Sequence, residues 1–134
     1  MLRLADASAQ GGTDSEHFML WLVERVGSVA DPTAVLVRWL KDWRERMEFN
    51  SLTFLLSNGT SLWAYRDYGE TRLAANETAQ DREKYYTLHA TRVERSAVVC
   101  SEPLKDISKF WQPLAQRTLA IFSPDMLAPQ TILI

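Results

Sequence analysis

The stretch "SLTFLLSNGTSLWAYRDYG", residues 51–69, decides the fold of this chain. Two runs of aliphatic and aromatic side chains flank Asn58-Gly59, a dipeptide that is the strongest short-range signal for a β-hairpin. The first run, Leu52 to Leu56, is almost continuously apolar, which is typical of a strand covered on both faces. The sequence therefore predicts an antiparallel hairpin in the middle of the chain.

Two amphipathic helices are predicted before the hairpin. Thr13 and Glu16 match a capping box, and the helical spacing that follows stops at Gly27. Asp31 is a natural N-cap and Pro32 fits the first position of a second helix. The apolar face of that second helix is formed by Val35, Trp39, Trp43 and Met47, with Leu36 and Leu40 beside them.

Further strands are predicted after the hairpin. Residues 69–84 are polar and predict an exposed loop, and strands are expected over residues 85–91, 96–101 and 118–122. The connection between the last two predicts a loop with a short helical turn ending at residues 111–113, and the tail "QTILI" predicts an edge strand. The layout indicates one α+β domain over residues 1–134, with two helices packed on a largely antiparallel sheet.

Composition excludes several classes of protein. The chain has 134 residues and a formal net charge of -2, so it has no positive footprint for nucleic acid. Its single cysteine, Cys100, excludes an intrachain disulfide and gives no reason to expect secretion. No segment has the apolar length of a signal peptide or of a membrane span. These features predict a cytoplasmic protein that does not bind membranes.

Nucleophilic and metal chemistry find little support in the sequence. Cys100 could be paired with His17 or His89 as nucleophile and base, but it follows a Val-Val run in a predicted strand, which favours a buried and inert thiol. The two histidines, one cysteine and scattered acids show no metal-ligand spacing. There is no GxGxxG and no phosphate-binding loop. We therefore expect no metal and no cofactor.

Asp14, in the turn "GGTDSE", has two interpretations. An acid in the first turn of a helix interacts favourably with the helix dipole, by about 0.3–1 kcal/mol. The same position directs a carboxylate out of a helix start that follows two glycines, where it could bind a substrate ammonium group. The spacing alone leaves both interpretations open.

Three segments together resemble the class II glutamine amidotransferases. They are "GGTDSEHFMLWLVERVG", "SLTFLLSNGTSLWAYRDYG" and "VVCSEPLKDISKFWQPLAQRTLAIF", which follow one another from Gly11 to Phe122. The resemblance is to the small stand-alone branch of these N-terminal-nucleophile (Ntn) hydrolases and implies part of an αββα sandwich. It implies that Asp14 binds the α-amino group of glutamine or of a γ-glutamyl compound, with Thr13 and Glu16 shaping the turn. Ser101 and Glu102 of the "SEP" match are given the structural task of fixing the turn after a central strand.

The chain departs from this family at the catalytic residues. The family's nucleophile is an N-terminal cysteine whose own α-amine acts as the base, and its oxyanion donors and carboxylate clamp precede the Thr-Asp-Ser-Glu turn. The dozen residues before that turn contain no cysteine. We expect the C-terminal half of the fold, inactive alone, with one face of the "LTFLL" and "AVVC" strands uncovered. The partner would be a chain carrying the cysteine half or a second copy of this chain.

Other functions stay open at this stage. The chain could be a catalytically inactive interaction or regulatory module, homodimeric or paired with another chain. It could also be part of a longer parent protein. The sequence does not identify the amide hydrolysed or the destination of the ammonia.

Overall fold

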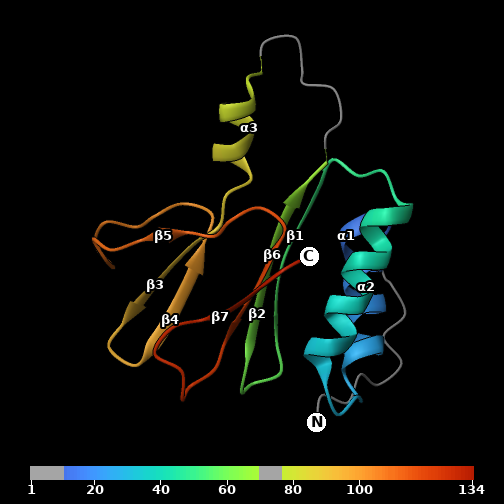
Figure 1. The fold of residues 1–134 in the computed structure, drawn as a ribbon, viewed down its shortest axis with the longest axis horizontal. Coiled ribbons are helices and arrows are strands. Elements are labelled where there is room, and N and C mark those ends of the chain that lie inside the picture. The colour runs from blue at the N-terminus through green and yellow to red at the C-terminus, as the bar shows by residue number, and fades with distance from the viewer. Residues whose placement is uncertain (1–10, 70–76) are drawn as a thin grey trace. The chain divides into compact units, whose positions relative to one another are not determined.

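A computed structural model describes residues 11–69 and 77–134 of the chain. The helices in these ranges are α1 (Asp14–Val26), α2 (Pro32–Arg46) and α3 (Ala79–Tyr85). The strands are β1 (Ser51–Ser57), β2 (Leu62–Tyr68), β3 (His89–Val93), β4 (Ser96–Cys100), β5 (Gln112–Pro113), β6 (Thr118–Phe122) and β7 (Gln130–Leu133) (Figure 1). The α+β class with antiparallel strands is confirmed. No helix in the described ranges has the length and apolar character needed to cross a membrane.

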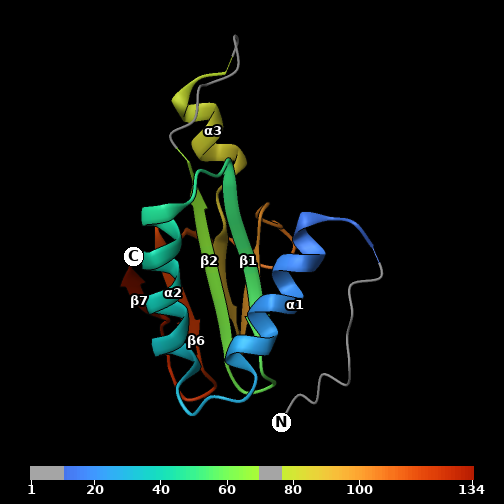
Figure 2. The same ribbon diagram turned by 90° about the vertical axis from the view of Figure 1, so that its right-hand side faces the viewer.

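The chain forms two compact units, residues 1–45 and 46–134. In the first unit α1 and α2 run in opposite directions (Figure 2). The Trp39 ring lies at their contact, 5.5 Å from the Phe18 ring, 4.7 Å from the Trp21 ring and 5.2 Å from the Trp43 ring, measured between centroids. Because these rings fill the contact between the helices, Trp39 and Trp43 are packing residues, as the sequence predicts.

Helix α2 ends earlier than its apolar pattern predicts. Asp31 caps its start as expected, since Asp31 Oδ1 accepts a hydrogen bond from the Ala34 amide at 3.0 Å. The helix stops at Arg46, so the prediction that Met47 belongs to its apolar face is wrong: Met47 is 48% exposed. Residues 47–49 have no regular secondary structure, and β1 begins at Ser51.

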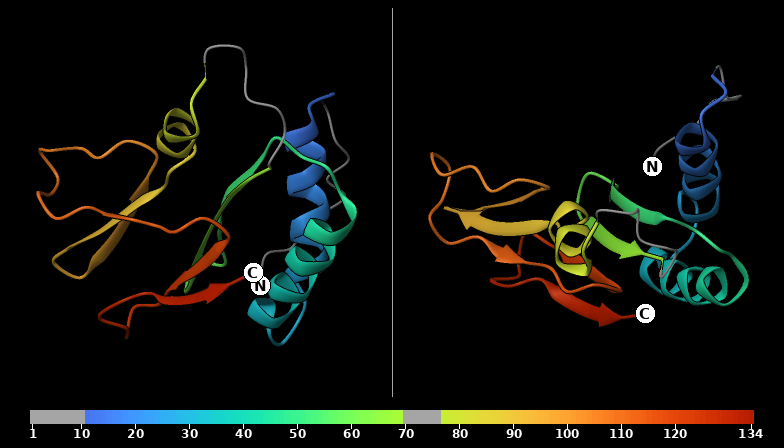
Figure 3. Two further views of the ribbon diagram at one scale, coloured as in Figure 1. Left: turned by 45° about the horizontal axis from the view of Figure 1, so that its top comes forward. Right: turned by 90° about the horizontal axis from the view of Figure 1, so that it is seen from above.

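The second unit contains two antiparallel sheets (Figure 3). One has the strand order β1-β2-β6-β7 and the other β4-β3-β5. A hydrophobic cluster joins side chains of both sheets and of the segments between them, with Leu62, Ala97 and Val99 packed against it. Its buried members are Ala64, Leu88, Ala90, Leu114, Ala120 and Phe122.

The hairpin of β1 and β2 is confirmed, but its burial differs from the prediction. Burial alternates strictly along β1, with Leu52, Phe54 and Leu56 buried and Leu55 41% exposed. The expectation that this run is covered on both faces is therefore wrong, because every second side chain along β1 is exposed. Strand β2 lies inside the sheet and is buried on both faces over its central residues.

The loop at the tip of this hairpin has four residues between the strands, Asn58 to Ser61. Asn58 Oδ1 accepts hydrogen bonds from the amides of Thr60, at 3.0 Å, and Ser61, at 2.8 Å. Gly59 has φ +87°, in the left-handed region that glycine adopts without strain. The asparagine and glycine thus shape the loop, as their pairing predicts.

Four further predictions about the second unit need correction. The polar stretch expected to be a loop contains α3, whose N-terminus is capped by Thr78 and Asp81 in a capping box. The helical turn expected at residues 111–113 is replaced by β5, which pairs with β3. Strand β4 was expected to be central, but it borders the three-stranded sheet, and Cys100 at its end is half-buried, not buried. The tail forms the edge strand β7 as predicted.

Candidate functional site

The first turn of α1 is built by the two residues that the sequence assigns to it. Thr13 is the N-cap, with φ -89° and ψ 140°, and its Oγ1 accepts a hydrogen bond from the Glu16 amide at 3.3 Å. The Glu16 carboxylate accepts a hydrogen bond from the Gly11 amide at 2.8 Å. A Cβ at Gly11 would collide with this carboxylate oxygen, so the glycine allows the close approach. Thr13 and Glu16 therefore order the residues on both sides of Asp14.

Asp14 is the first residue of α1, and it is exposed. Its carboxylate has no hydrogen bond or ion pair with any residue in the part of the chain that the structure describes. Capping is carried out by Thr13, so Asp14 contributes to the helix only through its charge at the positive end of the dipole. An exposed, unengaged carboxylate in an ordered turn is able to bind a cationic group.

Cys100 and His89 meet across the β3–β4 ladder. They are directly opposite each other in the antiparallel register, and the Nδ1 atom of His89 is buried without a hydrogen-bond partner among the described residues. The Cys100 thiol, however, donates to the Glu102 carbonyl oxygen at 2.9 Å. This bond directs the thiol proton to the backbone and not to the imidazole. His17, the other candidate base, is exposed on α1.

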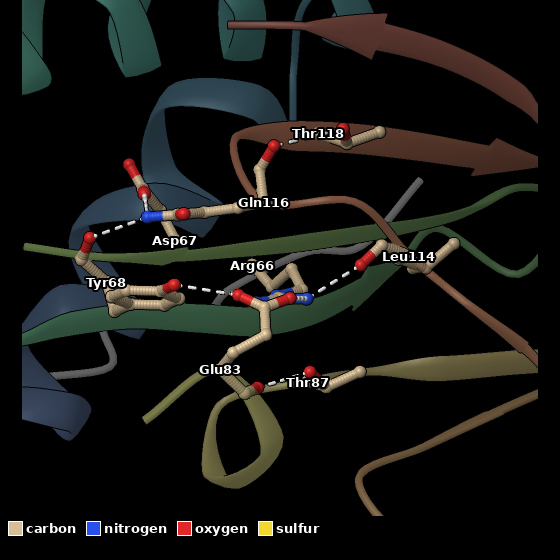
Figure 4. A network of polar contacts seen from close by, with 8 residues as sticks. All are labelled: Arg66, Asp67, Tyr68, Glu83, Thr87, Leu114, Gln116 and Thr118. Atoms are coloured by element: carbon tan, nitrogen blue, oxygen red, sulfur yellow. Dashed lines mark hydrogen bonds and ion pairs between the residues drawn. The ribbon is translucent and has the colours of Figure 1, made fainter. Parts of the chain in front are cut away.

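A polar network centres on the buried Arg66 in β2 (Figure 4). Arg66 is 0% exposed, and its Nη1 donates to Glu83 Oε1 of α3 at 2.9 Å and to the Leu114 carbonyl oxygen at 2.8 Å. Tyr68 donates its hydroxyl to Glu83 Oε2 at 2.7 Å. The Thr87 hydroxyl donates to the Glu83 carbonyl oxygen. Glu83 thus joins α3 to β2 through its side chain and to the start of the next segment through its backbone.

The network shifts the titration of two of its members. The Arg66 hydrogen bond holds the pKa of Glu83 below its ordinary value of 4.5, with the Tyr68 hydroxyl acting in the same direction. The hydrogen bond to Glu83 raises the pKa of Tyr68 above its ordinary value of 10.0, and burial adds to that shift. Glu83 is therefore charged and Tyr68 neutral at neutral pH, which suits the buried guanidinium.

Asp67, the neighbour of Arg66, belongs to a second set of contacts. Tyr65 donates its hydroxyl to Asp67 Oδ2 at 3.2 Å, and Gln116 Nε2 donates to Asp67 Oδ1 at 3.2 Å and to the Tyr68 carbonyl oxygen at 2.9 Å. Sequence reasoning missed both Arg66 and Asp67. The available signal was two consecutive charges inside an aromatic strand, "AYRDY", since such charges are buried only when they are paired.

The residues within 11–69 and 77–134 include no group of three or more His, Cys, Asp or Glu side chains that could hold a metal ion. The structure therefore offers two polar features in separate units. One is the exposed turn around Asp14, and the other is the polar network around the buried Arg66. Of these, only the turn presents an unengaged charged group at the surface.

A family model described as glutamine amidotransferases class-II matches residues 6–131, which is most of the chain. No curated protein and no solved structure matches. The match includes both the turn around Asp14 and the hairpin that carries Arg66.

Proposed function

The chain belongs to the class II glutamine amidotransferases, and from this premise we propose that α1 supplies the carboxylate that binds the α-ammonium group of glutamine or of a γ-glutamyl compound. Asp14 is that carboxylate, and Thr13 and Glu16 fix the turn that presents it. In the complete enzyme the reaction is hydrolysis of a γ-glutamyl amide with release of ammonia. Asp14 orients the substrate and transfers no proton.

The observation that supports this proposal is that Thr13 and Glu16 make the side-chain hydrogen bonds of the first turn of α1, and Asp14 makes none of them. Thr13 Oγ1 takes the Glu16 amide, and the Glu16 carboxylate takes the Gly11 amide. Asp14 is exposed and contributes to neither bond. Asp31 at the start of α2, by contrast, accepts the Ala34 amide, so its carboxylate already has a partner within the chain.

The proposal assigns the nucleophile to polypeptide outside these 134 residues. The one cysteine of the sequence, Cys100, donates its thiol proton to a backbone carbonyl and lies at the end of a strand. In the proposed mechanism an N-terminal cysteine, with its α-amine as base, attacks the amide carbon and forms a thioester as ammonia leaves; water then hydrolyses the thioester. A segment or chain that carries this cysteine half completes the site.

The test is a thermodynamic cycle on glutamine hydrolysis by the protein purified with its partner from its own cells. Native mass spectrometry first identifies a stoichiometric partner with an N-terminal cysteine. The Asp14→Asn variant and wild type are then compared on L-glutamine and on glutaramate, which lacks the α-amino group. Because a hydrogen bond to a charged group contributes about 1.5–3 kcal/mol, Asp14→Asn should raise KM for glutamine about 10- to 100-fold. KM for glutaramate should be unchanged by the substitution.

Asp31→Asn provides the matched control. It also removes a carboxylate at a helix start, and asparagine caps helices about as well as aspartate. This variant should leave KM unchanged for both substrates. Equal effects of Asp14→Asn on glutamine and glutaramate, or a loss of melting temperature with no change in KM, would contradict the assignment of Asp14 to the ammonium group.

A non-catalytic interaction module is the second candidate function. Several large apolar side chains are strongly exposed in the second unit: Tyr85 is 78% exposed, Phe110 80%, Leu127 90% and Leu133 73%. Exposed apolar surface of this kind marks interaction sites when it forms a patch. This function predicts stable association that neither glutamine nor the Asp14→Asn substitution changes.

A further inference from the structure

Strand β1 borders its sheet in the described part of the chain, and its sequence lacks the features that usually protect an edge. It is seven residues long, contains no charge and no proline, and pairs with β2 in an unbroken register from Ser51↔Tyr68 to Ser57↔Leu62. Among the described strands, only β2 neighbours it in the sheet. Natural proteins blunt such edges with charges, prolines, bulges or short length, since an open edge accepts another strand.

The other borders of the two sheets have such protection. Strand β7 has four residues and follows Pro129, and β5 has two residues, one of which is Pro113. Strand β4 has five residues and is flanked by the charged turn residues Glu94 and Arg95. Among the described strands, β1 is therefore the longest of the strands that border a sheet, and it has neither charge nor proline.

The sequence of β1, "SLTFLLS", is nearly palindromic about Phe54. When two copies of the strand run antiparallel with Phe54 at the centre, each serine faces a serine and each of Leu52 and Leu56 faces the other. Thr53 then faces Leu55 of the second copy. The only mismatch is Thr53 against Leu55, and both of these side chains are exposed.

This symmetry preserves the two faces of the sheet. Leu52, Phe54 and Leu56 are buried and alternate with exposed residues along the strand. In the palindromic register the buried set of one copy lies beside the buried set of the other, and the exposed sets also lie together. No charge of β1 meets a like charge.

We propose that β1 is a self-pairing surface, through which two copies of this chain form one continuous antiparallel sheet across a twofold axis at Phe54. The pairing uses the one open edge of β1 in each copy, so it closes at the dimer and does not extend into a filament. The pairing involves β1 of the second compact unit and no residue of the turn around Asp14, which lies in the first.

The test compares two double variants that differ only at residue 55. In Thr53→Glu/Leu55→Glu, the register places two glutamates opposite two glutamates across the axis. In Thr53→Glu/Leu55→Lys, it places each glutamate opposite a lysine. Opposite charges in facing cross-strand positions are favourable and like charges unfavourable, so the dimer dissociation constants should differ by about tenfold or more. Sedimentation velocity over a wide concentration range measures both constants, with circular dichroism to confirm folding.

Wild-type protein and the Glu/Lys variant should be dimeric, and the Glu/Glu variant should be monomeric at the same concentration. A monomeric wild type would overturn the proposal. So would equal association of the two variants, because another surface would then hold the copies together. Association of β1 with a different chain, with no dimer of this one, would also overturn it.

A crosslinking experiment tests the register without adding charge. In a Cys100→Ser background, Ser51→Cys and Ser57→Cys together should give disulfide-linked dimers on oxidation, since residue 51 faces residue 57 of the other copy. The two positions lie at opposite ends of a seven-residue strand, about 20 Å apart, so they cannot bridge within one chain. Each single cysteine variant is the control and should stay uncrosslinked; crosslinking in a single variant contradicts the register.

Discussion

Replacing Glu83 with glutamine should destabilise the second unit, because Glu83 carries the only ionic contact of Arg66 among the described residues. The guanidinium has 0% exposure, while the Glu83 side chain is 47% exposed. The Nε and Nη2 atoms of Arg66 are buried without hydrogen-bond partners in the described part of the chain. The guanidinium therefore depends on the charge of Glu83 and on the Leu114 carbonyl oxygen.

The expected loss follows from the intermediate burial of this pair. Removing one partner of a fully buried ion pair costs about 3–5 kcal/mol, whereas an exposed pair contributes about 0–1 kcal/mol. Glutamine keeps an oxygen that accepts from Arg66, and water reaches the half-exposed end of the side chain. We therefore expect Glu83→Gln to lower the free energy of unfolding by about 1–2 kcal/mol at neutral pH.

Urea unfolding at several pH values measures this loss and its origin. The pKa of Glu83 in the folded protein is lowered from 4.5, mainly by the Arg66 hydrogen bond. The unfolded chain therefore takes up a proton before the folded protein does as the pH falls. The stabilisation by Glu83 should be complete above its unfolded pKa, decline below it, and vanish below the folded pKa. The difference between wild type and Glu83→Gln should follow the same course.

A loss that stays constant from neutral pH to well below 4.5 would refute the ionic reasoning, since Glu83 would then act only through packing. A loss below about 0.3 kcal/mol at neutral pH would show that the pair contributes no more than a surface contact. Glu102→Gln is the matched control, because Glu102 is exposed and its change should stay within about 0.5 kcal/mol.

Two further substitutions test local structure in the second unit. Thr78→Ala should cost about 1 kcal/mol in urea unfolding, because Thr78 Oγ1 accepts the Asp81 amide at 3.1 Å at the start of α3. Thr78→Ser, which keeps the hydroxyl, should cost less, and equal losses would contradict the capping role. Gly59→Ala should cost about 1–2 kcal/mol because φ is +87° while the space around the site is open; an unchanged urea midpoint would show that the loop relaxes.

Local signals in the sequence predicted the elements that depend on neighbouring residues. The cap of α1 at Thr13, its stop at Gly27 and the loop at Asn58-Gly59 all lie where the sequence places them. Each depends on hydrogen bonds or dihedral angles within a few residues. Such signals need no knowledge of distant contacts, which is why they can be identified without a structure.

Elements that depend on distant contacts were predicted less well. Helix α3 has few apolar residues to give a helical period, and none of its residues is buried. Its position is set instead by Glu83, which reaches Arg66 from seventeen residues away in sequence. Met47 has helical spacing but lies beyond the end of α2. A pattern of hydrophobicity reveals neither the contact between Glu83 and Arg66 nor the point at which α2 ends.

The candidate site divides in the same way. The family resemblance points to Asp14, and its surroundings could be inferred because the capping signals lie beside it. The charges of Arg66 and Asp67 were visible in the sequence, but their partners come from α3 and from the segment before β6. Their burial could therefore not be predicted from the strand alone.

Arg66 and Asp67 together fix the segment that leads into β6. Consecutive residues of a strand point to opposite faces, so the two side chains reach this segment from opposite sides of β2. Arg66 binds the Leu114 carbonyl oxygen, and Asp67 accepts from Gln116. The Arg117 amide also donates to the Arg66 carbonyl oxygen at 3.0 Å.

These contacts explain how a chain that leaves one sheet at β5 returns to the other between β2 and β7. The connection is short and includes Arg117, which has φ 61°. Arg66 and Asp67 bind polar groups of this connection. In "LWAYRDYG" the charges are therefore engaged in holding the fold together. The hairpin thus holds the connection between the two sheets through buried charges, whereas Asp14 is an exposed carboxylate without a partner among the described residues.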